Sequence, residues 1–287
     1  MHSTWSRRKF LGATAASAAA LGMGHWGARR AHAADAQDRF GGFNLGLQSY
    51  TLRGFKVDRA IEMMQSLGLH SVEFFDAHFP VASTDEQIAA MKKSTAAAGI
   101  KIMGHGVNPF SKNHDANRRY FEFAKKAGIR NISADPSEDS FDSLDKLCEQ
   151  YDIRIAIHNH GPGARYDKVT DVLNAVTGHH KNIGACADLG HYIRSAEDPV
   201  KVITLLEGRL FGIHLKDFKE QKANTQGVIL GKGHLDVEGV FRALKKVNFP
   251  ADGCLSLEYE ENEKDPIADV TECVTIAATA AQKAAKA

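Results

Sequence analysis

Short runs of apolar residues recur along the chain, and amphipathic stretches separate most of them. Most runs begin about 25–30 residues apart, which is the length of one strand–helix unit. Between the runs, apolar residues recur with the spacing of one helix face. The eight predicted strands span residues 44–49, 70–75, 100–105, 130–134, 153–158, 183–188, 210–215 and 254–258. The predicted helices span residues 57–67, 85–98, 114–127, 140–149, 166–176, 199–206 and 237–246, with an alanine-rich final helix at 264–287.

Eight alternations of strand and helix favour a parallel sheet closed into a (β/α)₈ TIM barrel. The structural alternative is an open, doubly wound sheet. Such a sheet normally has a glycine-rich turn after its first strand, and the segment Gln48-Ser49-Tyr50-Thr51 is no such turn. No linker or low-complexity block divides the chain. We therefore predict a single barrel domain over residues 34–287.

The first 33 residues have the pattern of an export signal. The segment around Arg7 and Arg8 resembles the twin-arginine motif, and a weakly apolar run over residues 13–24 follows it. Ala31-His32-Ala33 then fits a cleavage site. An uncleaved membrane anchor is the alternative, but the run is too short and too rich in Ala and Gly to span a bilayer well. We expect residues 1–33 to be removed, no stable membrane insertion afterwards, and a periplasmic or secreted product.

The distribution of charge argues against a polyanionic partner. The whole chain carries a formal charge of +1, and residues 1–33 hold five basic residues and no acid. The remainder is therefore mildly acidic, at −4. Such a surface gives no electrostatic reason to expect a nucleic acid or an anionic membrane as partner.

The four cysteines form no C-x-x-C pair, so a zinc knuckle or a thioredoxin-like site is unsupported. Export permits disulfides, and the sequence leaves their pairing open. Cys186 and Cys254 fall inside predicted strands. We interpret both as small core residues.

Side chains that bind metals stand at the carboxyl ends of four consecutive predicted strands. The carboxyl ends of barrel strands form the active-site face. Side chains alternate between the two faces of a strand, and each of these residues shares its face with small residues below it. We therefore predict that all four point into the barrel mouth, namely His158, Asp188, His214 and Glu258.

A single histidine at a strand end is more commonly a hydrogen-bonded loop residue, and a single acid is commonly a helix cap. Four such residues on adjacent strands favour a metal site, because unpaired polar groups are costly to bury. Their mixture of imidazole nitrogen and carboxylate oxygen suits Mn²⁺, Fe²⁺, Co²⁺ or Zn²⁺ better than Ca²⁺. The sequence thus predicts one divalent metal ion.

A set of short motifs in the second half of the chain resembles a known superfamily. The motifs are Asp188-x-x-His191, His214-Leu215-Lys216-Asp217, Gly231-x-Gly233-x-x-Asp236 and a terminal strand that ends Leu257-Glu258. On these motifs, residues 43–268 resemble the xylose-isomerase-like superfamily of sugar isomerases and epimerases. That superfamily also includes inosose dehydratases, hydroxypyruvate isomerases and the endonuclease IV branch.

The resemblance implies that Asp188, His214 and Glu258 are three of four ligands that hold a divalent ion against two substrate oxygens. His191 matches a residue that contacts a substrate oxygen. The resemblance also implies a homodimer, because paired barrels are common in the superfamily.

The fourth family ligand is a glutamate in a Glu-x-x-Asn motif, and this chain departs from it. Ala156 stands at the glutamate position, while Asn159 is retained. His158 or His160, on the same strand face, would supply the replacement ligand. In the epimerases the missing glutamate is also one of two carboxylates that move protons on opposite faces of the substrate. Its loss fits a lyase or a one-base isomerase at least as well as an epimerase.

Glu258 is the family-like catalytic base, and Glu73 and His105 are further candidates that we place at the barrel mouth. Lys216 is expected to orient the substrate or to stabilise developing charge. For Glu73 and His105 the alternative is a positioning or core role, and for Lys216 it is an ion pair with the residue that follows it. The residues predicted to bind substrate are His191, His160, Asn159 and Asp217.

We expect a metal-dependent isomerase or epimerase that acts on a free ketose or keto-sugar through a metal-bound enediolate. The alternative is a lyase that uses the same chemistry for β-elimination from a 3-keto-glycoside or for dehydration of a keto-inositol. A non-catalytic sugar-binding barrel is a third hypothesis, but it predicts loss of the metal ligands. An exported enzyme meets few sugar phosphates, so we expect an unphosphorylated sugar or polyol as substrate.

Overall fold

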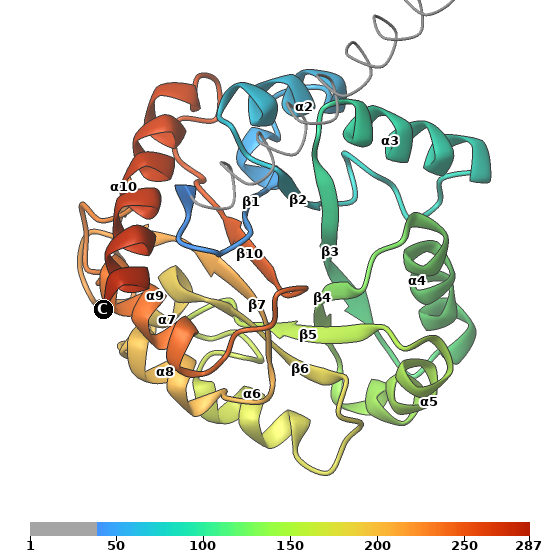
Figure 1. Cartoon of the computed structure of the whole chain (residues 1–287). Helices are drawn as coiled ribbons and strands as arrows, with labels where there is room; N and C mark the ends of the chain where they lie inside the picture. Colours follow the sequence, from blue (N-terminus) through green and yellow to red (C-terminus); the bar gives the residue numbers. More distant parts are fainter. Residues whose placement is uncertain (1–38) are drawn as a thin grey trace, which may run out of the picture.

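A computed structural model describes residues 39–287, so the predicted export signal at residues 1–33 lies outside the described residues. Eight parallel strands close into a barrel, and the chain's helices surround it (Figure 1). The order around the barrel is β1-β10-β7-β6-β5-β4-β3-β2. The predicted (β/α)₈ TIM barrel is confirmed. The barrel strands are β1 (Leu45–Gln48), β2 (Ser71–Phe74), β3 (Lys101–Phe110), β4 (Asn131–Pro136), β5 (Arg154–His158), β6 (Ile183–Asp188), β7 (Leu210–Leu215) and β10 (Cys254–Leu257).

The helices begin and end at residues suited to those positions. Thr84 and Gln87 form a reciprocal capping box at the start of α3, and Gly128 ends α4 in the left-handed region at φ 77°. The outer helices are α2 (Val57–Ser66), α3 (Asp85–Ala97), α4 (His114–Ala127), α5 (Phe141–Tyr151), α6 (Val169–Val176), α8 (Pro199–Leu205), α9 (Val237–Lys246) and α10 (Ile267–Lys286). Among the described residues, none of these helices combines the length and the apolar character needed to cross a membrane.

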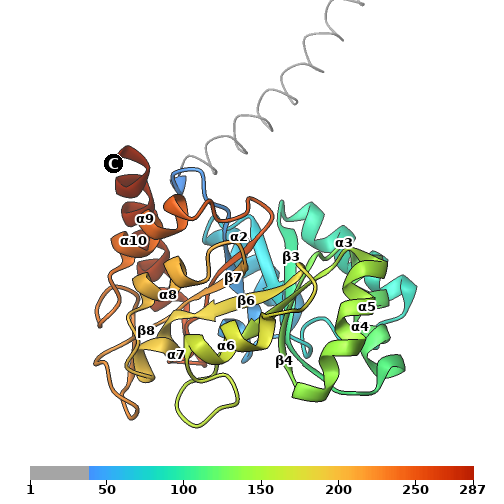
Figure 2. The same ribbon diagram turned by 90° about the horizontal axis from the view of Figure 1, so that it is seen from below.

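Several short elements were not predicted from the sequence. They are the 3₁₀ turns η1 (Ser49–Leu52) and η2 (Glu138–Ser140), helix α7 (Leu189–Arg194) and the antiparallel strands β8 (Asp217–Phe218) and β9 (Gly227–Val228). β3 is also longer than predicted and continues to Phe110. Figure 2 shows α7 and β8 at the end of the barrel opposite to the end at which the chain finishes.

The core has two parts. The larger part lies between the strands and the surrounding helices and includes Ile155 and Ile157 of β5. A small cluster of Ala156, Cys186 and Phe211 is separate from it. All four cysteines are free and buried, so the predicted core role of Cys186 and Cys254 is confirmed.

Candidate active site

The four predicted metal ligands come together at the carboxyl ends of β5, β6, β7 and β10. Each offers one ligand atom, and these atoms all lie within 4.8 Å of one another. Neighbouring parallel strands in register produce this convergence: Asp188 is the sheet partner of His214, and Glu258 directly follows β10. His158 Nε2 lies 3.0 Å from His214 Nδ1 and 3.5 Å from Asp188 Oδ2. His214 Nδ1 lies 3.3 Å from Glu258 Oε2.

Of the buried atoms in this cluster, His158 Nδ1 has no hydrogen-bond partner, and Asp188 Oδ2 pairs with the Lys216 ammonium at 2.9 Å. The carboxylate oxygen faces imidazole nitrogens of His158, His191 and His214 at 3.5–3.8 Å. Buried carboxylates need compensating positive charge, and Lys216 supplies one such charge for both Asp188 and Glu258, which leaves room for a cation. Two imidazoles and two carboxylates are also a donor set that suits a divalent transition-metal ion. The residues present therefore fit the predicted ion.

Lys216 adds a positive charge beside the cluster. Its ammonium lies 2.9 Å from Asp188 Oδ2 and 2.6 Å from Glu258 Oε2, and it also contacts Glu260. Burial alone would lower the pKa of Lys216, but these carboxylates raise it well above its ordinary value. The alternative of an ion pair between Lys216 and Asp217 is wrong, because the lysine pairs with the three other acids.

A pocket of about 550 Å³ opens above the cluster. Of the predicted residues, His158, His160, His191, Lys216 and Glu258 line it. Sequence reasoning missed several polar lining residues. Two of them carried a usable signal, since Arg194 follows His191 by one helical turn and Glu260 is two residues beyond Glu258. The missed residues are Gln48, Tyr50, Asp76, Arg194 and Glu260.

The structure distinguishes the two histidines that were alternatives for the fourth ligand. His158 belongs to the ligand cluster, whereas His160 packs edge-on against the ring of His158 and tilted against that of His191, at centroid distances of 4.5 and 5.8 Å. Burial lowers the pKa of His160, and it lowers the pKa of His191 to about 3. Both rings are therefore neutral at pH 7 and offer hydrogen bonds to a substrate at the pocket wall.

Glu73 and His105 are not at the barrel mouth, which corrects their predicted position. Glu73 lies inside the barrel beneath the cluster, with hydrogen bonds to His214, Ser133 and Ser256. His105 turns outward, where its ring packs against Phe79 and Phe123.

The sheet register explains the orientation of His105. It shifts between Val72 and Glu73, where β2 pairs with β3. Gly104 takes an inward position, since a Cβ there would meet Glu73 and Cys254. The alternation of faces then sends the side chain of His105 toward the helices.

Asn159 and Asp217 hold backbone segments, which differs from the predicted substrate contact. Asn159 is buried and exchanges two hydrogen bonds, of 3.0 and 2.8 Å, with the backbone C=O and N–H of Asp188. Asp217 accepts hydrogen bonds from the backbone N–H groups of Gly231, Gly233 and Leu235 at 2.9–3.0 Å. The first of these residues positions a ligand strand, and the second anchors the loop after β9.

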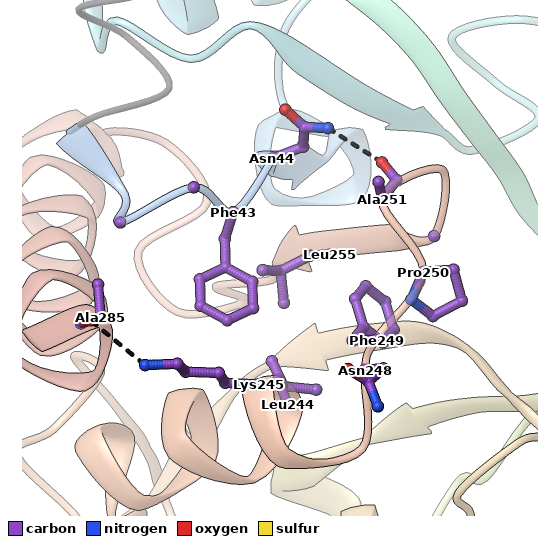
Figure 3. Close-up of a pocket in the computed structure, with 13 residues that line it drawn as sticks. Phe43, Asn44, Leu244, Lys245, Asn248, Phe249, Pro250, Ala251, Leu255 and Ala285 are labelled. Atoms are coloured by element: carbon purple, nitrogen blue, oxygen red, sulfur yellow. Dashed lines mark hydrogen bonds between the residues drawn. The ribbon is translucent and has the colours of Figure 1, made fainter. Parts of the chain in front are cut away.

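A second hollow, of about 300 Å³, lies at the amino ends of β1 and β10 (Figure 3). Two of its polar side chains are hydrogen-bonded to neighbouring backbone. Asn44 donates to the carbonyl of Ala251 at 3.0 Å, and the Lys245 ammonium donates to that of Ala285 at 3.3 Å. Phe43 and Phe249 form apolar walls. No set of convergent catalytic groups lines this hollow, so the pocket above the ligand cluster is the candidate active site.

The fold and the site define a TIM barrel with a buried cluster of side chains that could hold a metal ion at the carboxyl ends of its strands. The chain belongs to the xylose isomerase-like TIM barrel family, whose family model matches residues 61–275. The predicted superfamily is thereby confirmed.

Individual relatives carry enzyme names. An inosose dehydratase of Clostridium botulinum (strain Eklund 17B / Type B) is 25% identical over 233 residues, which cover 71% of this chain and 72% of that protein. A crystal structure from Parabacteroides distasonis ATCC 8503 is 28% identical, with a TM-score of 0.63, and covers 81% of this chain and 96% of that one. An L-ribulose 3-epimerase has a TM-score of 0.69 at 14% identity, covering 85% of this chain and 96% of that one, and shows likeness of fold alone. The relatives named by sequence similarity are enzymes, as the dehydratase shows, and the epimerase shares the fold.

Proposed function

We propose that the protein is a divalent-metal-dependent carbon–oxygen lyase that acts on an unphosphorylated keto-polyol or keto-sugar. The observation that carries the proposal is Ala156. Where the resemblance expects a second carboxylate, this chain has a methyl group buried with Cys186 and Phe211. Epimerisation with two bases needs a carboxylate on each face of the substrate, whereas elimination needs one base. The dehydratase relative supports the same choice.

His158, Asp188, His214 and Glu258 would hold the ion. When bound, the ion supplies Lewis acidity that makes the C–H beside the substrate carbonyl more acidic. The family's sugar-processing relatives and the pocket's polar wall support a small hydroxylated substrate. Tyr50 and Phe75, in edge-to-face contact at 5.4 Å, provide an apolar surface for the carbon face of such a substrate.

Glu258 is the base in this proposal. It lines the pocket, and although burial would raise its pKa, Lys216 and His214 lower it well below its ordinary value, so it is ionised at neutral pH. Its carboxylate accepts the proton from the carbon beside the carbonyl and then passes it to the departing oxygen on the neighbouring carbon. The C–H and C–O bonds break, a C=C bond forms, and water or an alcohol leaves. Lys216 stabilises the negative charge that develops meanwhile.

A one-base isomerase of a free ketose is the second candidate. Glu258 has access to one face of a bound substrate, and it can return the proton to the neighbouring carbon instead of to an oxygen. Both reactions begin with the same proton removal, and they differ in whether a C–O bond breaks.

The test uses purified protein reconstituted with Mn²⁺, Co²⁺ or Zn²⁺, with bound metal measured by elemental analysis. The protein receives a keto-inositol or a 3-keto-glucoside in D₂O, and ultraviolet absorbance reports the conjugated enone product. We expect elimination by the native protein and a rate about 10²–10⁴-fold lower in Glu258→Gln. Glu263→Gln, at an exposed acid (53%), is the matched control and should behave as native.

Deuterium exchange without enone would replace the lyase by the isomerase. Stoichiometric metal without either reaction would overturn both enzymatic assignments in favour of a sugar-binding barrel. Native protein that binds no metal after reconstitution would overturn the metal-dependent mechanism itself.

We further propose that the protein is exported through the twin-arginine route. Replacement of Arg7 and Arg8 by lysine should keep the precursor in the cytoplasm, which cell fractionation would detect. Unchanged processing of that variant would contradict the twin-arginine assignment. The homodimer stays a prediction.

A further inference from the structure

His214 is held at both edges of its imidazole ring. Its Nδ1 edge faces the ligand cluster, 3.0 Å from His158 Nε2 and 3.3 Å from Glu258 Oε2. Its Nε2 edge faces the barrel interior, 2.9 Å from Glu73 Oε2. The side chains of His214 and Glu73 are both 0% exposed, so no solvent competes for this contact.

Glu73 is itself fixed by strands around the barrel. Ser133 of β4 donates to its Oε1 at 2.5 Å, and Ser256 of β10 donates to its Oε2 at 2.9 Å. Gly104 of β3 leaves room for the side chain, because a Cβ there would lie 3.3 Å from Glu73 Cγ. Both carboxylate oxygens thus accept hydrogen bonds from neighbouring strands, and Glu73 does not line the pocket.

We propose that Glu73 is a positioning residue, whose carboxylate accepts the Nε2–H of His214 and thereby directs the Nδ1 lone pair of that ring at the bound metal ion. Both oxygens of Glu73 already accept hydrogen bonds from serine hydroxyls, so Nε2 of His214 carries the proton of the contact between them. In a neutral imidazole the other nitrogen then holds a lone pair. Carboxylates behind metal-bound histidines act in this way in many proteins. The inference rests on the proposed metal-dependent function.

The balance of buried charge gives Glu73 a second effect on the ion. A divalent cation and the Lys216 ammonium together carry three positive charges. Asp188 and Glu258 supply two buried negative charges, and the more exposed Glu260 also pairs with the lysine. Glu73 supplies a further negative charge that solvent does not reach, so its loss removes buried compensation for the ion.

The experiment compares the native protein with Glu73→Gln and Glu73→Ala. Asp217→Asn is the matched control, because Asp217 is also a buried carboxylate but its hydrogen bonds go to backbone N–H groups. Zn²⁺ affinity is measured by competition with a chelator. The ring protonation of His214 is read from long-range ¹H–¹⁵N spectra, with the resonance assigned by its disappearance in His214→Gln. Circular dichroism of each metal-free protein reports folding.

We expect Zn²⁺ affinity to fall about 10–100-fold in both Glu73 variants and to stay within about twofold of native in Asp217→Asn. The His214 ring should have a single Nε2–H form in the Zn²⁺-bound native protein and lose it in Glu73→Ala. If Glu73→Ala does not fold, the isosteric Glu73→Gln decides.

Native affinity and an unchanged His214 spectrum in a folded Glu73 variant would overturn the positioning role and leave the proposed function intact. A native protein that binds no Zn²⁺ would instead refute the proposed function.

Discussion

Asp217 is an informative position for mutation, because the sequence predicts that it contacts substrate whereas the structure shows that it anchors a loop. Its carboxylate is buried and receives three backbone hydrogen bonds from a loop that returns to β8. Oδ2 accepts from Gly231 and Gly233, and Oδ1 accepts from Leu235. Asp217→Asn keeps the shape of the side chain but has only one acceptor oxygen. Its NH₂ group must then face at least one N–H donor.

The magnitude follows from these three contacts. Hydrogen bonds to a charged group contribute about 1.5–3 kcal/mol each, and neutral ones about 0.5–1.5 kcal/mol. Asp217→Asn loses at least one bond and weakens the others, which we expect to lower the free energy of unfolding by about 2–4 kcal/mol. For a domain of this size, that corresponds to a fall in Tm of roughly 10 °C.

The assay combines thermal unfolding of the metal-free protein with turnover of the substrate that the elimination assay identifies. A loop anchor predicts a lower Tm and a nearly native KM in the folded fraction at low temperature. Glu122→Gln, on the exposed face of α4, controls for loss of an acid and should leave Tm unchanged. A native Tm together with a large rise in KM would refute the argument and restore the substrate contact.

Three further predictions follow from the site. Asn159→Ala removes both hydrogen bonds to the backbone of Asp188. It should lower the free energy of unfolding, measured by urea titration, by about 2–4 kcal/mol, and it should weaken Zn²⁺ binding. A native value for either quantity would contradict the positioning role of Asn159. Burial lowers the pKa of His105 below 6.5, so the stability provided by its neutral form is complete above pH 6.5 and is lost as the pH falls. His105→Phe should therefore reduce the acid-induced loss of stability between pH 7.5 and 5, by up to about 1.4 kcal/mol per pH unit, and parallel curves for both proteins would show that His105 does not titrate in this range. Zn²⁺ at a hundred times its Kd should add about 2.7 kcal/mol of stability, an effect that chelation reverses and that His214→Gln should largely lose.

Much of the site was predictable because the sequence of each strand itself indicates which residues lie at its end and on which face. The alternation of apolar and small or polar positions identified eight strands, and it placed His158, Asp188, His214 and Glu258 at one end and on one face of the barrel. Parallel strands in a closed barrel bring such ends together whatever the details of the loops. For these four residues, the strand pattern and the convergence in space agree.

The tertiary structure decided the features that depend on how separate segments meet. The extra residue of β3 opposite Val72 and Glu73 sent His105 outward, and a register is a relation between two strands that neither strand's own pattern contains. Asp217 sits at a strand end, as a substrate contact would, but the loop that returns at Gly231 occupies its oxygens. Residue type and periodicity specify which face of a strand is buried. The partner of each buried polar group depends on contacts between residues far apart in the chain, and these exist only after the barrel closes.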